Sequence, residues 1–292
     1  MSNPCLKFAV ETLLKEANPN GGPYFRTTHF HKMMFLLYKQ LKKKNLDIKL
    51  PYSWYHYGPF MDGTEFERQV GVPISYYAPD EGPTRAIDCI SYEGIPSKNA
   101  RLVERESRSL VKRYKENDRY KFDYLNILLD NAYAFAPFEF QKVFNRGFIL
   151  ILKQFKSYDV SEEEVELYLD KLIKIFPYTE MHEVYDTFLE WNDTIHLALN
   201  YKNPSYIAVL AEKFWLIYSE LLHIKKNENI SDDIIELWSI NFPEKLDEYL
   251  AGQEQERRRL LQMRRRDRVP NEETQKIVVK LNDLAYNLAA KK

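Results

Sequence analysis

The chain has 292 residues, of which 45% are hydrophobic and 29% charged, and its formal net charge is −1. This composition is typical of a globular protein and excludes a disordered chain or a polybasic nucleic-acid coat. Two cysteines, Cys5 and Cys89, cannot build a disulfide framework, which favours a reducing, cytoplasmic setting. Charged residues interrupt the first 16 positions, and no apolar run approaches roughly 20 residues, so we expect neither a signal peptide nor a membrane span.

The first 100 or so residues alternate short apolar-periodic stretches with turn signals. The expected elements, in chain order, are a helix over 4–17, a helix from Thr28 to about 44, an aromatic strand over 50–57, a helix over 61–70, and extended runs over 74–78 and 85–92. A Pro-Asp-Glu-Gly-Pro turn between the last two runs predicts a β-hairpin. Helix, helix, strand, helix and hairpin is the order of a winged helix, so we expect a small winged-helix-like domain over residues 1–118.

The rest of the chain is helical by pattern, because only two of the nine glycines follow residue 100 and hairpins need such residues. Ser161 followed by Glu164 fits a capping box at one helix start. Helices are expected near 97–117, 121–134, 138–156, 161–175, 180–199, 204–223, 231–251, 253–268 and 271–290. We therefore predict a mainly α protein whose second domain, 119–292, is all-helical and ends in a basic helix.

Charge is unevenly distributed along the chain. Residues 1–120 carry 19 Lys and Arg against 14 Asp and Glu, residues 121–250 carry 12 against 23, and residues 251–292 carry 11 against 6. Basic ends around an acidic middle indicate a partner of opposite charge, or ends that fold onto the middle. An unevenly charged, solvated helical surface is the alternative.

Basic clusters supply the candidate residues for binding nucleic acid or a partner. Lysines in the last turn of a helix are also explained by the helix dipole, so phosphate contact is only one reading of the first cluster. Seven arginines within twelve positions exceed what capping needs, and Leu260, Leu261 and Met263 between them could dock the helix on the acidic middle, on a partner or beside nucleic acid. The candidates are Lys42, Lys43, Lys44, Lys49, Arg85, Arg257, Arg258, Arg259, Arg264, Arg265, Arg266 and Arg268.

No residue pattern identifies a reaction. The chain has no Gly-x-Ser-x-Gly, no Gly-rich phosphate loop and no Cys-x-x-Cys. His29 and His31 could share a metal with His56 only on an extended segment, so we expect no metal. With none of the motifs above, we also expect no cofactor and no small-molecule ligand. Asp193 and His196, three residues apart on a helix, are the remaining candidates for a hydrolase. We predict a protein that is not an enzyme.

One stretch resembles a known family. The residues are Lys32-Met33-Met34-Phe35-Leu36-Leu37-Tyr38, followed by Trp54-Tyr55-His56-Tyr57-Gly58-Pro59-Phe60. They are similar to the Panacea-type domain and related prokaryotic helix-turn-helix proteins. The resemblance implies a prokaryotic protein linked to regulation, toxin neutralisation or phage defence, and it carries over no catalytic residues.

These observations lead to three hypotheses about function. The first is a non-catalytic, winged-helix-containing subunit of a regulatory or phage-defence complex that has protein partners and contacts DNA. The second is an antitoxin-like module that neutralises a partner protein without binding DNA, which the acidic residues Asp62, Glu65 and Glu67 of the third helix favour. The third is an undetected hydrolase.

Overall fold

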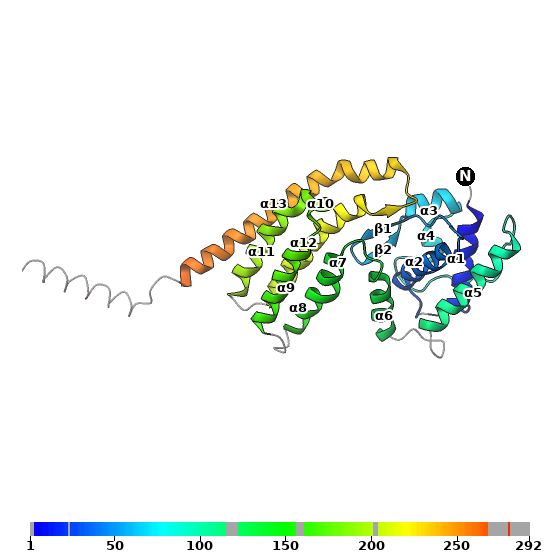
Figure 1. Ribbon diagram of the computed structural model, residues 1–292, viewed down its shortest axis with the longest axis horizontal. Coiled ribbons are helices and arrows are strands. Elements are labelled where there is room, and N and C mark those ends of the chain that lie inside the picture. Colours follow the sequence, from blue (N-terminus) through cyan, green and yellow to red (C-terminus); the bar gives the residue numbers. More distant parts are fainter. Residues whose placement is uncertain are drawn as a thin grey trace, which may run out of the picture.

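The computed structural model describes residues 3–22, 24–114, 122–155, 161–200, 204–267 and 280. These residues form a mainly α-helical protein with a small three-stranded antiparallel sheet (Figure 1). The elements are α1 (Pro4–Ala17), α2 (Thr27–Lys43), β1 (Tyr52–Tyr55), β2 (Gly58–Met61), α3 (Gly63–Val70), α4 (Ile74–Tyr77), α5 (Ser97–Tyr114), α6 (Phe122–Tyr133), α7 (Glu139–Val143), the π-helix η1 (Phe144–Phe148), α8 (Ile149–Phe155), α9 (Glu162–Ile175), α10 (Tyr178–Met181), the 3-10 helix η2 (His182–Val184), α11 (Tyr185–Leu199), α12 (Pro204–Lys225), β3 (Asn227–Glu228) and α13 (Asp232–Asp267).

Most of the expected helices are confirmed within a few residues. The capping box forms as predicted: the Ser161 hydroxyl accepts from the Glu164 amide at 3.2 Å, and the Glu164 carboxylate accepts from the Ser161 amide at 2.8 Å. The expected helix over 138–156 is interrupted by η1, whose widened turn lies among buried aromatic rings. The helix expected over 271–290 lies outside the described residues except for Lys280, which is helical.

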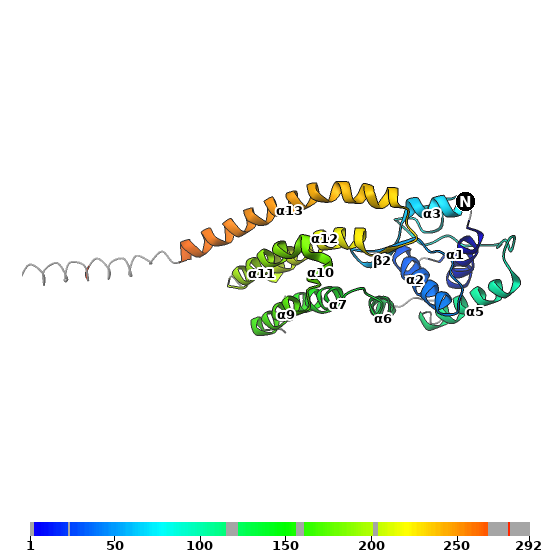
Figure 2. The same ribbon diagram turned by 45° about the horizontal axis from the view of Figure 1, so that its top comes forward.

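The two helices expected over 231–251 and 253–268 are a single helix, α13. Gly252 does not end it, because the apolar stripe continues on both sides, with Leu246 and Tyr249 before it and Leu260 after it packed on the core. A glycine inside a helix costs about 1 kcal/mol, less than burial of this stripe stabilises. Figure 2 shows α13 extending from beside α3 along α12 and beyond the end of α11.

The predicted hairpin over 74–92 is wrong. Residues 74–77 form α4, and 85–92 have no regular structure. Tyr77 is buried against Phe66, so the apolar pattern there serves a helical turn, and the amides of Thr84 and Arg85 donate to Phe25 and Tyr77 carbonyls. The hairpin that does form is β1–β2, directly after α2, in which Tyr55 pairs with Gly58. The winged-helix arrangement is therefore not confirmed.

The third strand comes from the far half of the chain. β3 pairs antiparallel with β1, with Tyr52 opposite Glu228, and gives the strand order β2-β1-β3. The segment expected to be all-helical therefore completes the sheet of the N-terminal half. The predicted boundary after residue 118 lies outside the described residues.

The β1–β2 turn also joins the two halves. The His56 carbonyl accepts from the Trp215 indole of α12 at 2.7 Å and from the Asn145 side chain of η1 at 3.4 Å. Gly58 has φ +89°, and a Cβ there would lie 3.1 Å from the Tyr133 ring of α6. The Gly58-Pro59 turn thus allows α6, η1 and α12 to pack closely around the hairpin.

Replacing Gly58 with Ala is expected to destabilise the protein by about 1–3 kcal/mol, because the left-handed conformation costs an L-residue about 1–2 kcal/mol and Tyr133 must also move. Gly71→Ala is the matched control, because φ is +84° there and a Cβ would meet nothing within 4 Å. Urea unfolding should show the larger loss at Gly58. Equal losses would mean that the Tyr133 contact has no effect.

Candidate nucleic-acid interface

The first predicted cluster of lysines is bound largely to the chain itself. The ammonium of Lys42 lies 2.7 Å from the Glu228 carboxylate, Lys44 lies 2.6 Å from Glu106, and Lys49 lies 3.0 Å from Asp47. Lys43 is exposed and has no ion pair among the described residues. Three of these four predicted phosphate ligands therefore have acidic partners within the protein.

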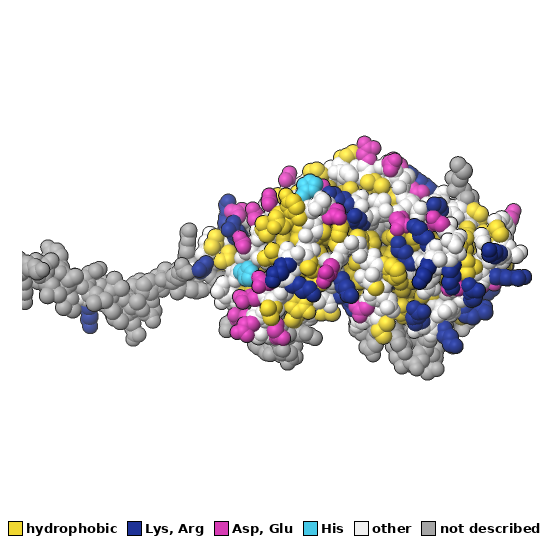
Figure 3. All heavy atoms as spheres, viewed as in Figure 1, with side chains coloured by type: hydrophobic (Ala, Val, Ile, Leu, Met, Phe, Trp, Pro, Cys, Tyr) yellow, Lys and Arg dark blue, Asp and Glu magenta, His cyan; other side chains and the backbone are white. Residues whose placement is uncertain are grey.

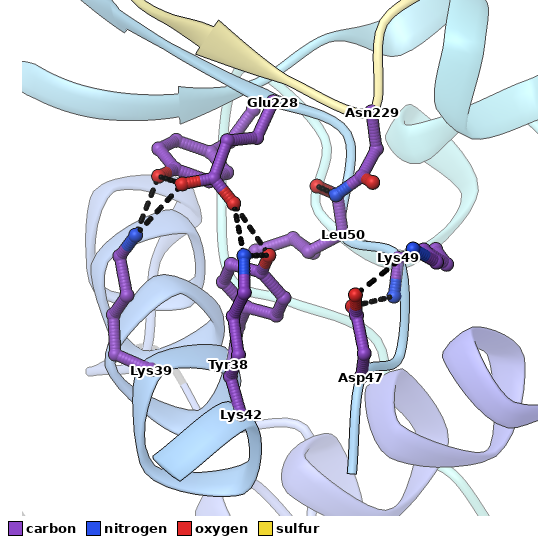
Figure 4. Close-up of polar contacts among 9 residues, drawn as sticks. Tyr38, Lys39, Lys42, Asp47, Lys49, Leu50, Glu228 and Asn229 are labelled. Atoms are coloured by element: carbon purple, nitrogen blue, oxygen red, sulfur yellow. Dashed lines mark hydrogen bonds and ion pairs between the residues drawn. The ribbon is translucent and has the colours of Figure 1, made fainter. Parts of the chain in front are cut away.

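Glu228 is the centre of this network (Figure 4). Its carboxylate accepts from the Tyr38 hydroxyl at 2.6 Å and the Tyr52 hydroxyl at 2.7 Å, and it also binds Lys39 at 3.1 Å and Lys42. Partial burial alone would raise its pKa, but these hydrogen bonds outweigh burial and lower the pKa of Glu228 to about 2. The cluster fastens β3 to α2 and β1, so its role is structural.

The other predicted basic residues lie apart from these lysines. The Arg85 guanidinium is exposed and lies 4.1 Å above the centre of the Tyr76 ring. In α13, Arg258 lies 2.6 Å from Glu254, and Arg259 lies 3.9 Å from Glu256. Arg85 is thus on a loop next to α4, whereas the other predicted arginines belong to the distal part of α13, which follows Gly252.

The distal part of α13 is only partly packed. Leu260 is buried, whereas Leu261 and Met263 keep 37% and 38% of their surface exposed. Arg257 is half-buried and Arg264 is exposed. Arg265 and Arg266 lie in α13, but their side chains are outside the described structure, as is the whole of Arg268.

A basic surface that the sequence reasoning missed lies on α5. Its five members, spaced three and four residues apart, share one helix face and are all exposed. With a rise of 1.5 Å per residue, the face is about 21 Å long. We call it the α5 basic face, and it consists of Lys98, Arg101, Arg105, Arg108 and Lys112.

The opposite side of α5 is buried, which holds the basic face outward. Val103, Leu110 and Tyr114 are at most 1% exposed, and α5 packs on α1 and α2. Lys and Arg side chains gather at this end of the molecule in Figure 3. The signal in the sequence is the repeat of basic residues at i, i+3, i+7, i+10 and i+14, which is the period of one helix face.

The acidic residues of α5 pair with only one member of this face, Arg105. Glu104 accepts from the Tyr92 hydroxyl at 2.6 Å, and Glu106 is buried between Lys44 and Arg105. Arg108 reaches Glu16 of α1 at 3.1 Å through an exposed pair. Lys98, Arg101 and Lys112 have no ion pair among the described residues. The exposed pair of Arg108 contributes about 0–1 kcal/mol, so Arg108 can exchange it for a phosphate, whereas Arg105 is held by the buried Glu106.

Helix α3, which follows the hairpin, is partly covered by the segment that leads into α13. The Arg68 guanidinium lies 2.7 Å from the Asp233 carboxylate and donates to the Ser231 hydroxyl at 2.8 Å. The Ser231 hydroxyl donates to Glu65 at 2.7 Å, and Asp62 caps α3 through the Glu65 amide. Asp62 and Glu65 therefore have partners within the protein, whereas the Glu67 side chain is exposed.

The three histidines considered for a metal do not converge. The buried His31 ring accepts from the Met61 amide at 3.1 Å, His29 accepts from the Arg26 amide at 3.4 Å, and His56 is in the β1–β2 turn. Burial lowers the pKa of His31 to about 3 and that of His29 to about 4. No group of three possible ligands occurs among the described residues.

The two residues considered for a hydrolase do not pair. Asp193 is exposed, and the structure shows no ion pair between Asp193 and His196, both of which it describes. Ser53 and His223 do form a pair, with Oγ and Nδ1 2.5 Å apart, and the His223 ring lies against the Trp238 ring, with the two ring planes tilted by 32°. Ser53 is fully buried, so no substrate reaches its hydroxyl, and the pair fixes β1 to α12.

Among the described residues, no helix combines the length and the apolar composition that a membrane span requires.

Comparison with known proteins gives no match: no family model, no curated protein and no solved structure is similar to this chain. The resemblance of residues 28–60 to the Panacea-type domain stays a prediction.

Proposed function

We propose that the protein binds the phosphate backbone of DNA through the α5 basic face, as a non-catalytic subunit of a regulatory or phage-defence complex in the cytoplasm. The observation that carries this proposal is the row of five exposed Lys and Arg side chains on one face of a firmly packed helix. The setting in regulation or defence is what the family resemblance implies. The lysines near residue 42 are secondary contacts at most, because most of them already have acidic partners.

This mode of binding does not read sequence. Lys and Arg contact phosphates through charge, whereas discrimination between bases needs polar side chains directed into a groove. In a winged helix, the helix that enters the groove would be α3, but α3 is acidic and partly covered by Ser231 and Asp233. If the N-terminal half acts like a winged helix, it therefore places α5 against the DNA backbone and does not insert α3 into the groove. We expect nearly equal affinity for unrelated duplex sequences.

A salt titration tests the proposal directly. Five phosphate contacts give a slope of about −4.5 in a plot of log affinity against log salt for duplex DNA, and about −3.5 for a single strand. The measurement is fluorescence anisotropy of a labelled 20-base-pair duplex from about 50 to 200 mM salt. Absence of binding at the lowest salt would remove the DNA hypothesis.

The antitoxin-like alternative has one observation in its favour. Leu237 and Ile240, one turn apart near the start of α13, keep 58% and 67% of their surface exposed. Leu237→Glu with Ile240→Glu should then abolish co-elution with a toxin encoded beside this protein and leave the DNA salt slope unchanged. If the double variant still co-elutes with that toxin, this surface is not the docking site.

A further inference from the structure

The loop that leads from α4 to α5 carries an exposed aromatic ring beside the α5 basic face. Tyr92 keeps 55% of its surface exposed, and its hydroxyl donates to the Glu104 carboxylate of α5 at 2.6 Å. Glu104 lies three residues after Arg101 and four residues before Arg108, so the three side chains are neighbours on the helix surface. The Tyr92 ring is therefore tied to the edge of the basic face, next to two of its arginines.

Three contacts fix this ring in place. The hydroxyl is bound to Glu104, the Phe8 ring of α1 lies 5.1 Å away with the planes tilted by 59°, and the Tyr92 carbonyl accepts from the Ile95 amide at 3.1 Å. Phe8 is 1% exposed, so it supports Tyr92 from the interior, and the opposite side of the ring faces water. A ring held in this way loses little side-chain entropy when a flat partner stacks on it.

The charges around the ring indicate what can stack there. Glu104 places a negative charge at the hydroxyl end of the ring, which disfavours a phosphate directly above it. Arg101 and Arg108 are exposed, so they attract phosphates one helix turn to either side of Glu104. Cations beside an uncharged flat surface match a nucleotide, whose phosphate is charged and whose base is neutral and flat.

We propose that Tyr92 is a stacking platform for an unpaired DNA base whose neighbouring phosphates lie on the α5 basic face. This inference rests on the proposed function and adds the class of substrate, DNA that has unpaired bases. Bases inside an intact duplex are stacked on one another and are out of reach of a ring at the protein surface. A single strand exposes the faces of its bases, and stacking on an aromatic side chain tolerates every base.

The test keeps the phosphates constant and removes the bases. The probes are an oligothymidylate of about 12 nucleotides and a strand of equal length made of abasic nucleotides, and anisotropy measures their affinities at about 0.1 M salt. The wild-type protein should bind the oligothymidylate about tenfold more tightly, because a stacked base contributes about that factor. Equal affinities for the two strands would overturn the inference.

Substitutions of Tyr92 separate stacking from stability and from charge. Tyr92→Leu should reduce the preference for the strand with bases to less than about twofold, whereas Tyr92→Phe keeps the ring and should preserve most of it. Both variants should bind a duplex as the wild type does, because all five members of the α5 basic face remain. If Tyr92→Leu lowers the affinity for both single strands by the same factor, Tyr92 only supports α5 and the inference is wrong.

Tyr178→Leu is the matched control. Tyr178 is 59% exposed and its ring lies 4.9 Å from one aromatic neighbour, Tyr185, but it belongs to α10, away from α5 in Figures 1 and 2. This variant should keep the tenfold preference, and a loss as large as that of Tyr92→Leu would contradict the assignment of the platform. If neither single strand nor duplex binds, the proposed function fails together with the inference. If the duplex binds with the expected salt slope and the bases have no effect, only the inference fails.

Discussion

Replacement of Lys98, Arg101 and Lys112 by Gln is expected to weaken DNA binding about 100-fold at 0.15 M salt. These three side chains lie on the α5 basic face and have no ion pair among the described residues, so they are the most available for phosphates. Each phosphate contact contributes about 0.9 to the salt slope, so the triple variant should lower the slope by about 2.7. If the two proteins bind equally at 1 M salt, a slope smaller by about 2.7 makes the affinity of the variant about 100-fold lower at 0.15 M salt. Anisotropy titrations at several salt concentrations measure both quantities.

The control for this prediction changes the same net charge elsewhere. Lys142 of α7 and Lys171 and Lys174 of α9 are exposed and belong to the acidic part of the chain. Their triple replacement by Gln should leave the slope unchanged and reduce affinity only a few-fold through long-range attraction. Circular dichroism should report equal helix content for both variants. Equal losses of affinity would show that net charge, and not the α5 basic face, governs binding.

The long helices could be predicted because their signals are local. Ser161 and Glu164 cap α9 within one turn, and the apolar period of α12 extends over 22 residues. Burial on one face repeats every three to four residues, which a single sequence displays directly. The basic face of α5 belongs to the same class of signal, since its charges repeat with the helix period. It could have been found by applying that period to Lys and Arg as well as to apolar residues.

The sheet could not be predicted in the same way. β3 is two residues long and pairs with a strand about 175 positions earlier, so it has no periodicity of its own. The run at 74–78 has the composition of a strand, but burial of Tyr77 selects a helical turn. Pro79 and Pro83 lie in a loop both in the predicted hairpin and in the structure. Whether such a segment forms a strand depends on pairing partners far apart in the chain, and composition alone does not reveal those partners.

Buried polar side chains show a similar limit. Gln253 is an ordinary polar residue of a helix by pattern, and only the packing of α13 on α11 and α12 buries it. Glu228 likewise looks like a loop carboxylate until Tyr38 and Lys42 surround it. A polar group becomes exceptional through burial and the presence or absence of partners, which are tertiary properties.

Glu228→Gln is expected to destabilise the protein by about 2 kcal/mol. The substitution keeps the shape of the side chain but removes the charge that binds Lys39 and Lys42, and it leaves Tyr38 and Tyr52 with a weaker acceptor. A pKa lowered from 4.5 to about 2 corresponds to about 3.4 kcal/mol without screening, and the 34% exposure of the side chain reduces that figure. For a chain of this size the Tm should fall by about 3 °C.

The pH dependence provides a sharper test of the same cluster. The folded-state pKa of Glu228 lies below its unfolded value, so its contribution is complete above about pH 4.5 and is lost as the pH falls towards about 2. The Tm difference between wild type and Glu228→Gln should therefore be constant from pH 7 to 5 and shrink between pH 4.5 and 2. Glu254→Gln is the matched control, because Glu254 forms a single exposed pair with Arg258 and should change the Tm little at any pH. A Tm difference at Glu228 that persists undiminished at pH 2.5 would show that shape and packing, and not the carboxylate charge, hold β3 to α2.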